Sequence, residues 1–178
     1  RLIMSSVFNP GEILEKIGVE TGITAADFGC GSGYFVLELA KRTGNKGKVF
    51  AIDVVPQALE SVRSLAKMRG LFNVETRWAN LEKTSTLNED SCDLVIASNL
   101  FFQVDKKFWE NIIEEIYKVL KKGGRALVID WDSKSVLGPP KDSRVGSDFI
   151  KDIFSDKFKA GKKFEAGETH WAIVFTKK

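Results

Sequence analysis

Hydrophobic residues along the chain form two kinds of pattern, which alternate from one end to the other. Short apolar runs typical of buried strands occupy residues 23–28, 48–53, 73–78, 93–97 and 125–131. Helical spacing of apolar residues predicts helices from Pro10 to about Gly18, around 35–40, from Pro56 to about Gly70, over 108–120 and over 145–154. Because strands and helices alternate, we predict an α/β fold whose parallel sheet is covered by helices on both faces.

The last part of the chain departs from this alternation. Strands at 157–164 and 169–176 are predicted to be antiparallel, because only the short turn 165–168 joins them. Gly123-Gly124 is predicted to end the helix over 108–120, and the segment 138–140 (Gly-Pro-Pro) predicts a loop. No repeat or long linker divides the chain. We therefore predict one domain over 1–178, with an N-terminal helical segment at 1–22 and the α/β core at 23–178.

The turn after the first predicted strand carries three glycines in the spacing G-x-G-x-G. A dinucleotide site uses G-x-G-x-x-G, but Tyr34 stands at its last position, and no P-loop sequence is present. Asp27, just before the turn, would repel a pyrophosphate but could hold an ammonium group. Asp53, at the end of the second strand, can accept hydrogen bonds from ribose hydroxyls. An amino acid joined to an adenosine is S-adenosylmethionine, which becomes the favoured ligand.

The motifs DFGCGSG, AIDVVPQAL, DSCDLVIASNLFFQV and YKVLKKGGRALVIDW extend this hypothesis over nearly the whole chain. In this order they resemble the motifs of class I S-adenosylmethionine-dependent methyltransferases, and most closely the broad group that contains quinone-biosynthesis and arsenite methyltransferases. The resemblance implies a Rossmann-like, mostly parallel sheet of seven strands whose last strand is antiparallel. It also implies S-adenosylmethionine as cofactor and S-adenosylhomocysteine as product.

The resemblance assigns the cofactor contacts residue by residue. Asp27 and the glycines of the turn would line the methionine end, Asp53 would bind the ribose, and Val54 would pack on the adenine. Asn80 stands where the family often has an Asp that receives the adenine amino group, and its amide oxygen can accept the same bond. The full set of expected cofactor contacts is Asp27, Gly29, Cys30, Gly31, Gly33, Tyr34, Asp53, Val54, Asn80, Leu81, Ser98 and Asn99.

The acceptor side is less defined by the residues. By the resemblance, the acceptor pocket begins at residues 98–100, which end with Leu100. Polar and aromatic side chains that could either line this pocket or belong to the core are Phe101, Phe102, Gln103, Trp131 and Asp132. His170, the only histidine of the chain, is as readily a structural side chain as a base. We name His170 and Asp132 as candidate catalytic residues, and Asp130 could serve as a base for the same acceptors. Direct in-line displacement at a sulfonium methyl needs little further acid–base chemistry.

Composition narrows the function by what it lacks. The 178 residues include two cysteines and one histidine, so neither a disulfide scaffold nor a zinc site is expected, and we predict no metal. Cys30 and Cys92 are interpreted as buried residues without thiol chemistry, too few to bind arsenite. A net charge of +3 neither indicates nor excludes nucleic acid, and the lysines at 157–163 are interpreted as a solvated face. No membrane-spanning run or signal sequence is evident, so a cytoplasmic location is expected.

We therefore expect an S-adenosylmethionine-dependent methyltransferase that acts on a small-molecule or lipid-like acceptor. Two alternatives stay open, namely a cofactor-binding subunit without transfer activity and a methyltransferase that acts on RNA or protein. The Asn-Pro-Pro-aromatic motif of enzymes that methylate base amino groups is absent, because Leu100 and Phe101 follow Asn99. Few residues remain outside the core to cover the acceptor, so a homodimer could complete the pocket.

Overall fold

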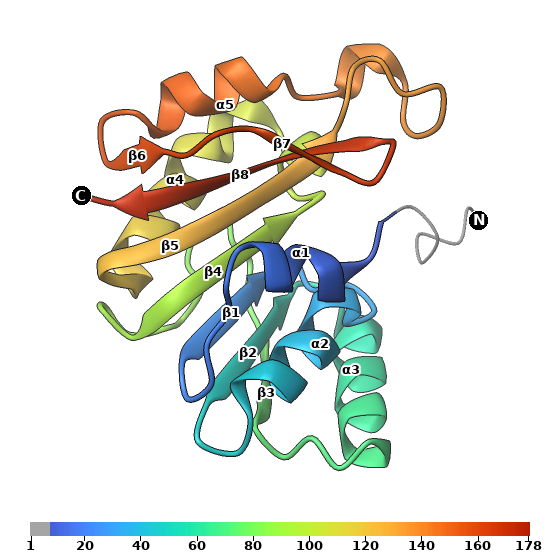
Figure 1. Cartoon of the computed structure of the whole chain (residues 1–178), viewed down its shortest axis with the longest axis vertical. Coiled ribbons are helices and arrows are strands. Elements are labelled where there is room, and N and C mark those ends of the chain that lie inside the picture. Colours follow the sequence, from blue (N-terminus) through green and yellow to red (C-terminus); the bar gives the residue numbers. More distant parts are fainter. Residues whose placement is uncertain (1–7) are drawn as a thin grey trace.

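The computed structural model describes residues 8–178, in which strands and helices alternate as the sequence pattern predicts (Figure 1). The strands are β1 (Thr24–Phe28), β2 (Lys48–Asp53), β3 (Val74–Trp78), β4 (Cys92–Ser98), β5 (Leu120–Trp131), β6 (Phe158–Ala160), β7 (Phe164–Ala166) and β8 (His170–Lys177). The α-helices are α1 (Pro10–Lys16), α2 (Tyr34–Thr43), α3 (Pro56–Met68), α4 (Trp109–Val119) and α5 (Ser147–Phe154). Residues 1–7 of the predicted N-terminal helical segment lie outside the described residues.

The described strands form one mixed sheet in the order β3-β2-β1-β4-β5-β8-β6, with β7 also paired to β8. Strands β1 to β5 are parallel to one another, whereas β8 is antiparallel to β5. β6 and β7 pair with opposite ends of β8 along the edge that β5 leaves free, so the eight strands fill seven positions. β4 occupies the central position. The seven-position sheet with antiparallel last strands confirms the predicted architecture.

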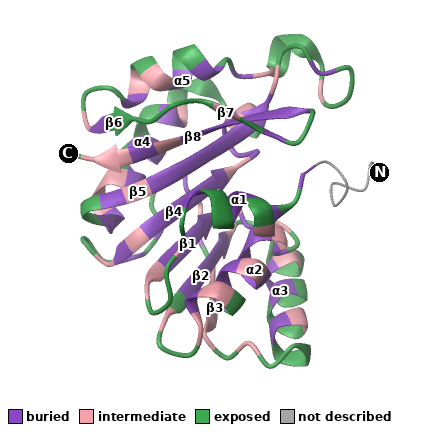
Figure 2. Cartoon of the chain, in the orientation of Figure 1, coloured by how far each residue is buried: buried purple, intermediate pink, exposed green. Residues whose placement is uncertain are grey.

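Helices cover both faces of the sheet, and each face has its own apolar core. α1, α2 and α3 pack on one face through side chains such as Leu14, Leu39 and Val62. α4 and α5 pack on the other face through Ile112 and Phe154. Figure 2 shows that the central strands are buried along most of their length, while the outer helix surfaces are exposed. With both faces covered, the edge at which the parallel strands end is left for a ligand. Within residues 8–178, no helix has the length and apolar character needed to cross a membrane.

The junction between α4 and β5 differs from the prediction that Gly123-Gly124 ends the helix. α4 ends at Val119, and the next residue, Leu120, has extended backbone and pairs with Cys92 of β4. Leu120 is fully buried in this pairing, which favours the extended backbone, so β5 begins before Gly123 and Gly124. They lie instead in an irregularity of β5, where the register with β4 shifts. The apolar spacing of the helix continues into the strand, so it could not mark the boundary.

The single strand predicted at 157–164 is wrong, because the structure has two short strands, β6 and β7. Gly161 lies between them and donates its N–H to the Val174 carbonyl at 2.8 Å. A Cβ at this position would lie 2.8 Å from the same carbonyl oxygen, so the chain passes close to β8 here. The predicted turn 165–168 is also displaced, because Glu165 and Ala166 belong to β7. Two short strands with a close crossing replace one continuous strand.

Gly33 offers a test of how closely α2 and α3 approach each other. It precedes α2 with φ +85°, and a Cβ there would lie 2.9 Å from Val62 Cγ2 on α3. Gly70 also has a positive φ, +66°, but no atom lies within 4 Å of its Cβ position. Gly70→Ala should cost about 1 kcal/mol of backbone strain, whereas Gly33→Ala should cost about 2 to 4 kcal/mol because the steric conflict adds to that strain. Urea unfolding measures both losses, and equal losses would contradict the packing role of Gly33.

Candidate functional site

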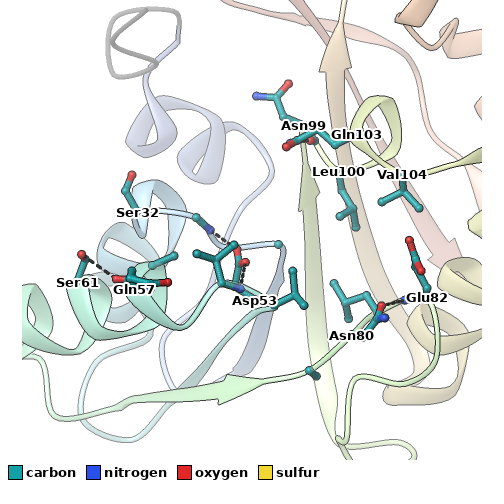
Figure 3. Close-up of a pocket in the computed structure, with 17 residues that line it drawn as sticks. Ser32, Asp53, Gln57, Ser61, Asn80, Glu82, Asn99, Leu100, Gln103 and Val104 are labelled. Atoms are coloured by element: carbon teal, nitrogen blue, oxygen red, sulfur yellow. Dashed lines mark hydrogen bonds between the residues drawn. The ribbon is translucent and has the colours of Figure 1, made fainter. Parts of the chain in front are cut away.

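A cavity of about 660 Å³ lies at the carboxyl ends of β1, β2, β3 and β4. Four chain segments line it, namely the glycine turn, residues 53–61, residues 79–82 and residues 99–104. Figure 3 shows Ser32, Gln57 and Ser61 on the side of Asp53, with Leu100, Gln103 and Val104 across from them. Its size is in the range of small-molecule and cofactor sites. The fold therefore brings together segments that are far apart in the sequence.

The carboxyl group of Asp53 fixes the glycine turn against the second strand. Its Oδ2 accepts a hydrogen bond from the Gly31 N–H at 2.8 Å, and its Oδ1 accepts one from the Val55 N–H at 2.9 Å. The N–H groups of Gly29 and Cys30 donate to the Ile52 carbonyl at 2.9 and 3.0 Å. Each carboxyl oxygen of Asp53 keeps a second lone pair for a ligand hydroxyl.

Asp27 lies under the turn rather than in the cavity wall, and it is almost completely buried. Burial, and then the negative charge of Asp53, raises the pKa of Asp27 to about 7. The Cys30 thiol beside it is also buried, which raises the pKa of Cys30 above its ordinary range. The Asp27 carboxyl group behind the glycine turn can therefore gain or lose its proton near neutral pH.

The third lining segment consists of the residues that follow β3. The Trp78 indole N–H donates to the Val54 carbonyl at 2.8 Å, which ties the end of β3 to the loop after β2. Asn80 Oδ1 accepts the Glu82 N–H at 3.0 Å, and the Glu82 carbonyl accepts a hydrogen bond from the Asn111 side chain of α4 at 3.2 Å. These bonds tie the segment that contains Asn80 and Glu82 to the loop after β2 and to α4.

The fourth lining segment, residues 99–104, begins at Asn99, directly after β4. Its backbone has a positive φ of 54°, a conformation that Asn tolerates better than most residues do. Asn99 Oδ1 lies 2.8 Å from His170 Nε2, and His170 Nδ1 lies 2.8 Å from Thr169 Oγ1. Burial, and secondarily the positive charge of Arg144, lowers the pKa of His170 to about 4. Both ring nitrogens are therefore engaged, and the ring is neutral near neutral pH.

The two aspartates considered as bases have different surroundings. Asp130 is fully buried, and burial raises its pKa to about 7 although it accepts the N–H groups of Trp131 at 2.8 Å and Phe102 at 3.2 Å. Asp132 is half-buried, and its Oδ1 accepts the Lys134 N–H at 2.8 Å. Neither aspartate lines the cavity.

The structure places the expected cofactor contacts in three groups. Those that line the cavity are Gly29, Gly31, Asp53, Val54, Asn80, Leu81 and Asn99. Gly33 and Tyr34 line a neighbouring cavity of about 610 Å³, which shares Ser32 with the first. Asp27 and Cys30 are buried behind the turn, and Ser98 is the last residue of β4. Of the residues expected near an acceptor, Leu100 and Gln103 line the cavity, whereas Phe101 and Trp131 belong to buried packing.

Several lining residues were not anticipated from the sequence. Ser32 lies inside the glycine turn, and its position between two expected glycines could have indicated it. Gln57 and Ser61 are four residues apart at the start of α3, so helical spacing places them on one face. Glu82 and Val104 carry no such signal. Among the lining residues, which all belong to the described chain, the charged side chains are Asp53 and Glu82, both acidic. This charge suits a cation.

Comparison with known proteins identifies the class of domain. The protein family described as "Methyltransferase domain" matches residues 25–124, which are more than half of the 178 residues. A crystal structure of an S-adenosylmethionine-dependent methyltransferase from Aquifex aeolicus matches with a TM-score of 0.88 and 26% identity, and the match covers 97% of this chain and 91% of that one. The fold is that of a class I S-adenosylmethionine-dependent methyltransferase domain. The chain belongs to the methyltransferase-domain family.

Two relatives are named for quinone biosynthesis. The ubiquinone/menaquinone biosynthesis C-methyltransferase UbiE of Escherichia fergusonii is 31% identical over 123 residues, which are 68% of this chain and 47% of that protein. The demethylmenaquinone methyltransferase of Oceanobacillus iheyensis is 25% identical over 134 residues, which are 71% of this chain and 52% of that protein. The chain thus spans about half the length of the curated relatives it matches.

The raised pKa of Asp27 predicts a specific dependence of stability on pH. The folded protein keeps the proton on Asp27 up to about pH 7, whereas the unfolded chain releases it near its ordinary pKa of 3.8. The free energy of unfolding therefore falls as the pH rises between these values, and Asp27→Asn removes this contribution. Relative to wild type, the variant should gain about 1 to 3 kcal/mol in unfolding free energy from about pH 5 to about pH 7.

Urea unfolding at several pH values measures this gain, and it separates the pH-dependent part from any constant effect of the substitution. Asp142→Asn, which alters an exposed carboxyl group, is the matched control and should follow wild type. A constant difference between Asp27→Asn and wild type over this range would show that Asp27 is ionised in the folded protein throughout.

Proposed function

We propose that this chain transfers a methyl group from S-adenosylmethionine to a small aromatic or lipid-like acceptor. The observation that carries the proposal is the cavity in which the glycine turn, Asp53 and the wall 99–104 meet. Its acidic lining favours a cationic cofactor, and its wall 99–104 offers an apolar surface with a few polar groups. The names of the relatives, which refer to quinone biosynthesis, support an acceptor of the quinone type.

The residues at the cavity fit S-adenosylmethionine in shape and charge. A Cβ on Gly31 would meet no atom within 4 Å, so the turn leaves open space where a ligand can approach the backbone. Asp53 would accept hydrogen bonds from the ribose, Val54 would pack on the adenine, and Asn80 would face its amino group. Asp27 would attract the ammonium of the methionine end from behind the turn. When bound, the cofactor supplies a methyl group on a positively charged sulfur, which an electron-rich acceptor atom can attack in line.

The chain's own contribution is alignment and exclusion of water. Leu100 and Val104 give the acceptor side an apolar surface, while Asn99 and Gln103 provide polar groups that can orient an acceptor. The side-chain amide of Gln103 donates a hydrogen bond to the backbone carbonyl of Asn99, which links the two residues. His170, with its pKa lowered to about 4 and both ring nitrogens engaged, lies outside the cavity lining, so the carboxyl groups of Asp53 and Glu82 are the charged groups there among the described residues. This arrangement suits an acceptor that is itself nucleophilic, such as a phenolate or an electron-rich ring carbon.

The first test is transfer of labelled methyl from S-adenosylmethionine into a cell extract separated into small-molecule, lipid, RNA and protein fractions. We expect label in the lipid or small-molecule fraction, because the cavity is lined by acids that would disfavour a polyanion. Heat-inactivated protein is the control. Label in RNA or protein would replace the proposed acceptor class, and bound cofactor without label in any fraction would indicate a subunit without transfer activity.

The proposed ribose contact predicts the effect of Asp53→Asn. An amide retains the shape of the side chain but has one acceptor oxygen instead of two, so a ligand hydroxyl loses its charged partner. Affinity for S-adenosylhomocysteine should fall by about 1.5 to 3 kcal/mol, or about tenfold or more, in calorimetric titration. Asp142→Asn is the control at an exposed carboxyl group, and circular dichroism checks the fold of both variants. Unchanged affinity would remove Asp53 from the cofactor site.

A further inference from the structure

The buried side chain of His170 is joined to the cavity through a single residue, Asn99. The two residues are 71 positions apart in the sequence, on β8 and directly after β4, and their side chains meet at 2.8 Å. The His170 ring also packs against Trp131, with centroids 4.1 Å apart, and against Phe8 at 4.9 Å. His170 does not line the cavity, so any influence on a ligand passes through Asn99.

Three of the four polar groups of Asn99 are engaged by the protein. Its N–H donates to the Ile129 carbonyl at 2.8 Å, its carbonyl accepts the Gln103 amide, and its Oδ1 accepts from His170 Nε2. Nδ2 has no partner among the described residues. It is not fully buried either, since Trp131 Nε1 is the one fully buried side-chain nitrogen or oxygen without a partner in residues 8–178. Asn99 lines the cavity, and Figure 3 shows its amide at the cavity rim, pointing away from Leu100 and Gln103, so Nδ2 is a free polar group at this rim.

The neighbours of His170 determine which way the Asn99 amide is turned. An amide oxygen only accepts, so Nε2 must carry the ring proton, and Nδ1 then accepts from the Thr169 hydroxyl. The opposite arrangement, with the proton on Nδ1, would turn the Asn99 amide over and leave Oδ1 as the free group at the rim. The tautomer of the ring and the chemistry of the cavity wall are therefore linked.

We propose that His170 is a positioning residue that holds the Asn99 side chain with Nδ2 free at the rim of the cavity, where it donates a hydrogen bond to an oxygen of the methyl acceptor. This inference rests on the proposed function and refines its acceptor class. An N–H₂ donor can bond to a carbonyl, phenolate or enolate oxygen, and it cannot accept a hydrogen bond from an N–H group. The positive φ of Asn99 brings the side chain to this place, and the burial of His170 keeps the ring neutral so that one nitrogen donates and the other accepts.

The tautomer can be measured without knowing the acceptor. His170 is the only histidine, so long-range proton–nitrogen spectra of histidine-labelled protein contain a single ring. We expect the Nε2–H form in the wild type and its loss or mixing in Asn99→Gly. Glycine accepts the positive φ at this position without strain. Thr86→Gly is the matched control, because Thr86 also has a positive φ, 63°, but is exposed and outside the cavity. A wild-type ring protonated on Nδ1 would overturn the proposal.

Transfer assays then separate the acceptor from the cofactor. At saturating S-adenosylmethionine, with the labelled extract fraction as acceptor source, Asn99→Gly and His170→Phe should transfer methyl at about one tenth of the wild-type rate or less when the fraction is dilute. Affinity for S-adenosylhomocysteine should stay within about twofold of wild type, because the missing bond is made to the acceptor. His170→Gln keeps a donor amide and should retain more activity than His170→Phe, and it also serves if the phenylalanine variant fails to fold.

The outcomes distinguish this inference from the proposed function. An equal loss of S-adenosylhomocysteine affinity in Asn99→Gly would assign Nδ2 to the cofactor and overturn the proposal alone. Unchanged transfer in Asn99→Gly and His170→Phe would do the same. If the wild-type protein labels no fraction, the proposed function itself fails, and this inference fails with it.

Discussion

The two carboxyl oxygens of Asp53 connect the backbone segments from which the cofactor end of the site is built. One accepts from Gly31 in the turn after β1, and the other accepts from Val55 before α3. The Asp53 carbonyl also accepts the Ala79 N–H after β3 at 3.1 Å. Glycines with positive φ impose no side-chain packing of their own, so the turn depends on such a partner for its shape. The same residue can therefore hold the turn and offer its remaining lone pairs to a ligand.

Asp27, Asp130 and His170 are buried titratable groups outside the cavity lining, and burial favours the neutral form of each. Asp27 and Asp130 have raised pKa values near 7, and the pKa of His170 is lowered. In a cavity already lined by Asp53 and Glu82, a further fixed negative charge would be costly without a cation nearby. A cation above the glycine turn would lower the pKa of Asp27 again. Asp27 can therefore become negatively charged when the proposed cofactor brings its cation near.

The sequence predicted the sheet, and it predicted seven of the residues that line the cavity, because both depend on local patterns. Strand runs, the glycine spacing and the acids near the ends of β1 and β2 stand in segments whose order fixes their place at one sheet edge. The predicted boundaries of helices and strands were wrong where the local apolar pattern conflicts with strand pairing. Leu120 continues the apolar stripe of α4 yet pairs with Cys92, and Gly161 splits a predicted strand where the chain crosses β8. Contacts with distant strands determine the element boundaries at these two residues. The sequence pattern of one segment does not reveal such contacts.

The acceptor end depends almost wholly on such long-range contacts. Asn99 is a polar residue after a strand in the sequence, and only its contact with His170, brought beside it by the antiparallel β8, gives its amide a direction. The backbone of Glu82, another lining residue, is likewise held by a distant residue, because its carbonyl accepts a hydrogen bond from Asn111 of α4. A resemblance carried by the glycine turn and the acid at the end of β2 therefore identifies the cofactor. In the function proposed above, the choice of acceptor would depend on pairs of residues that the fold brings together from distant strands.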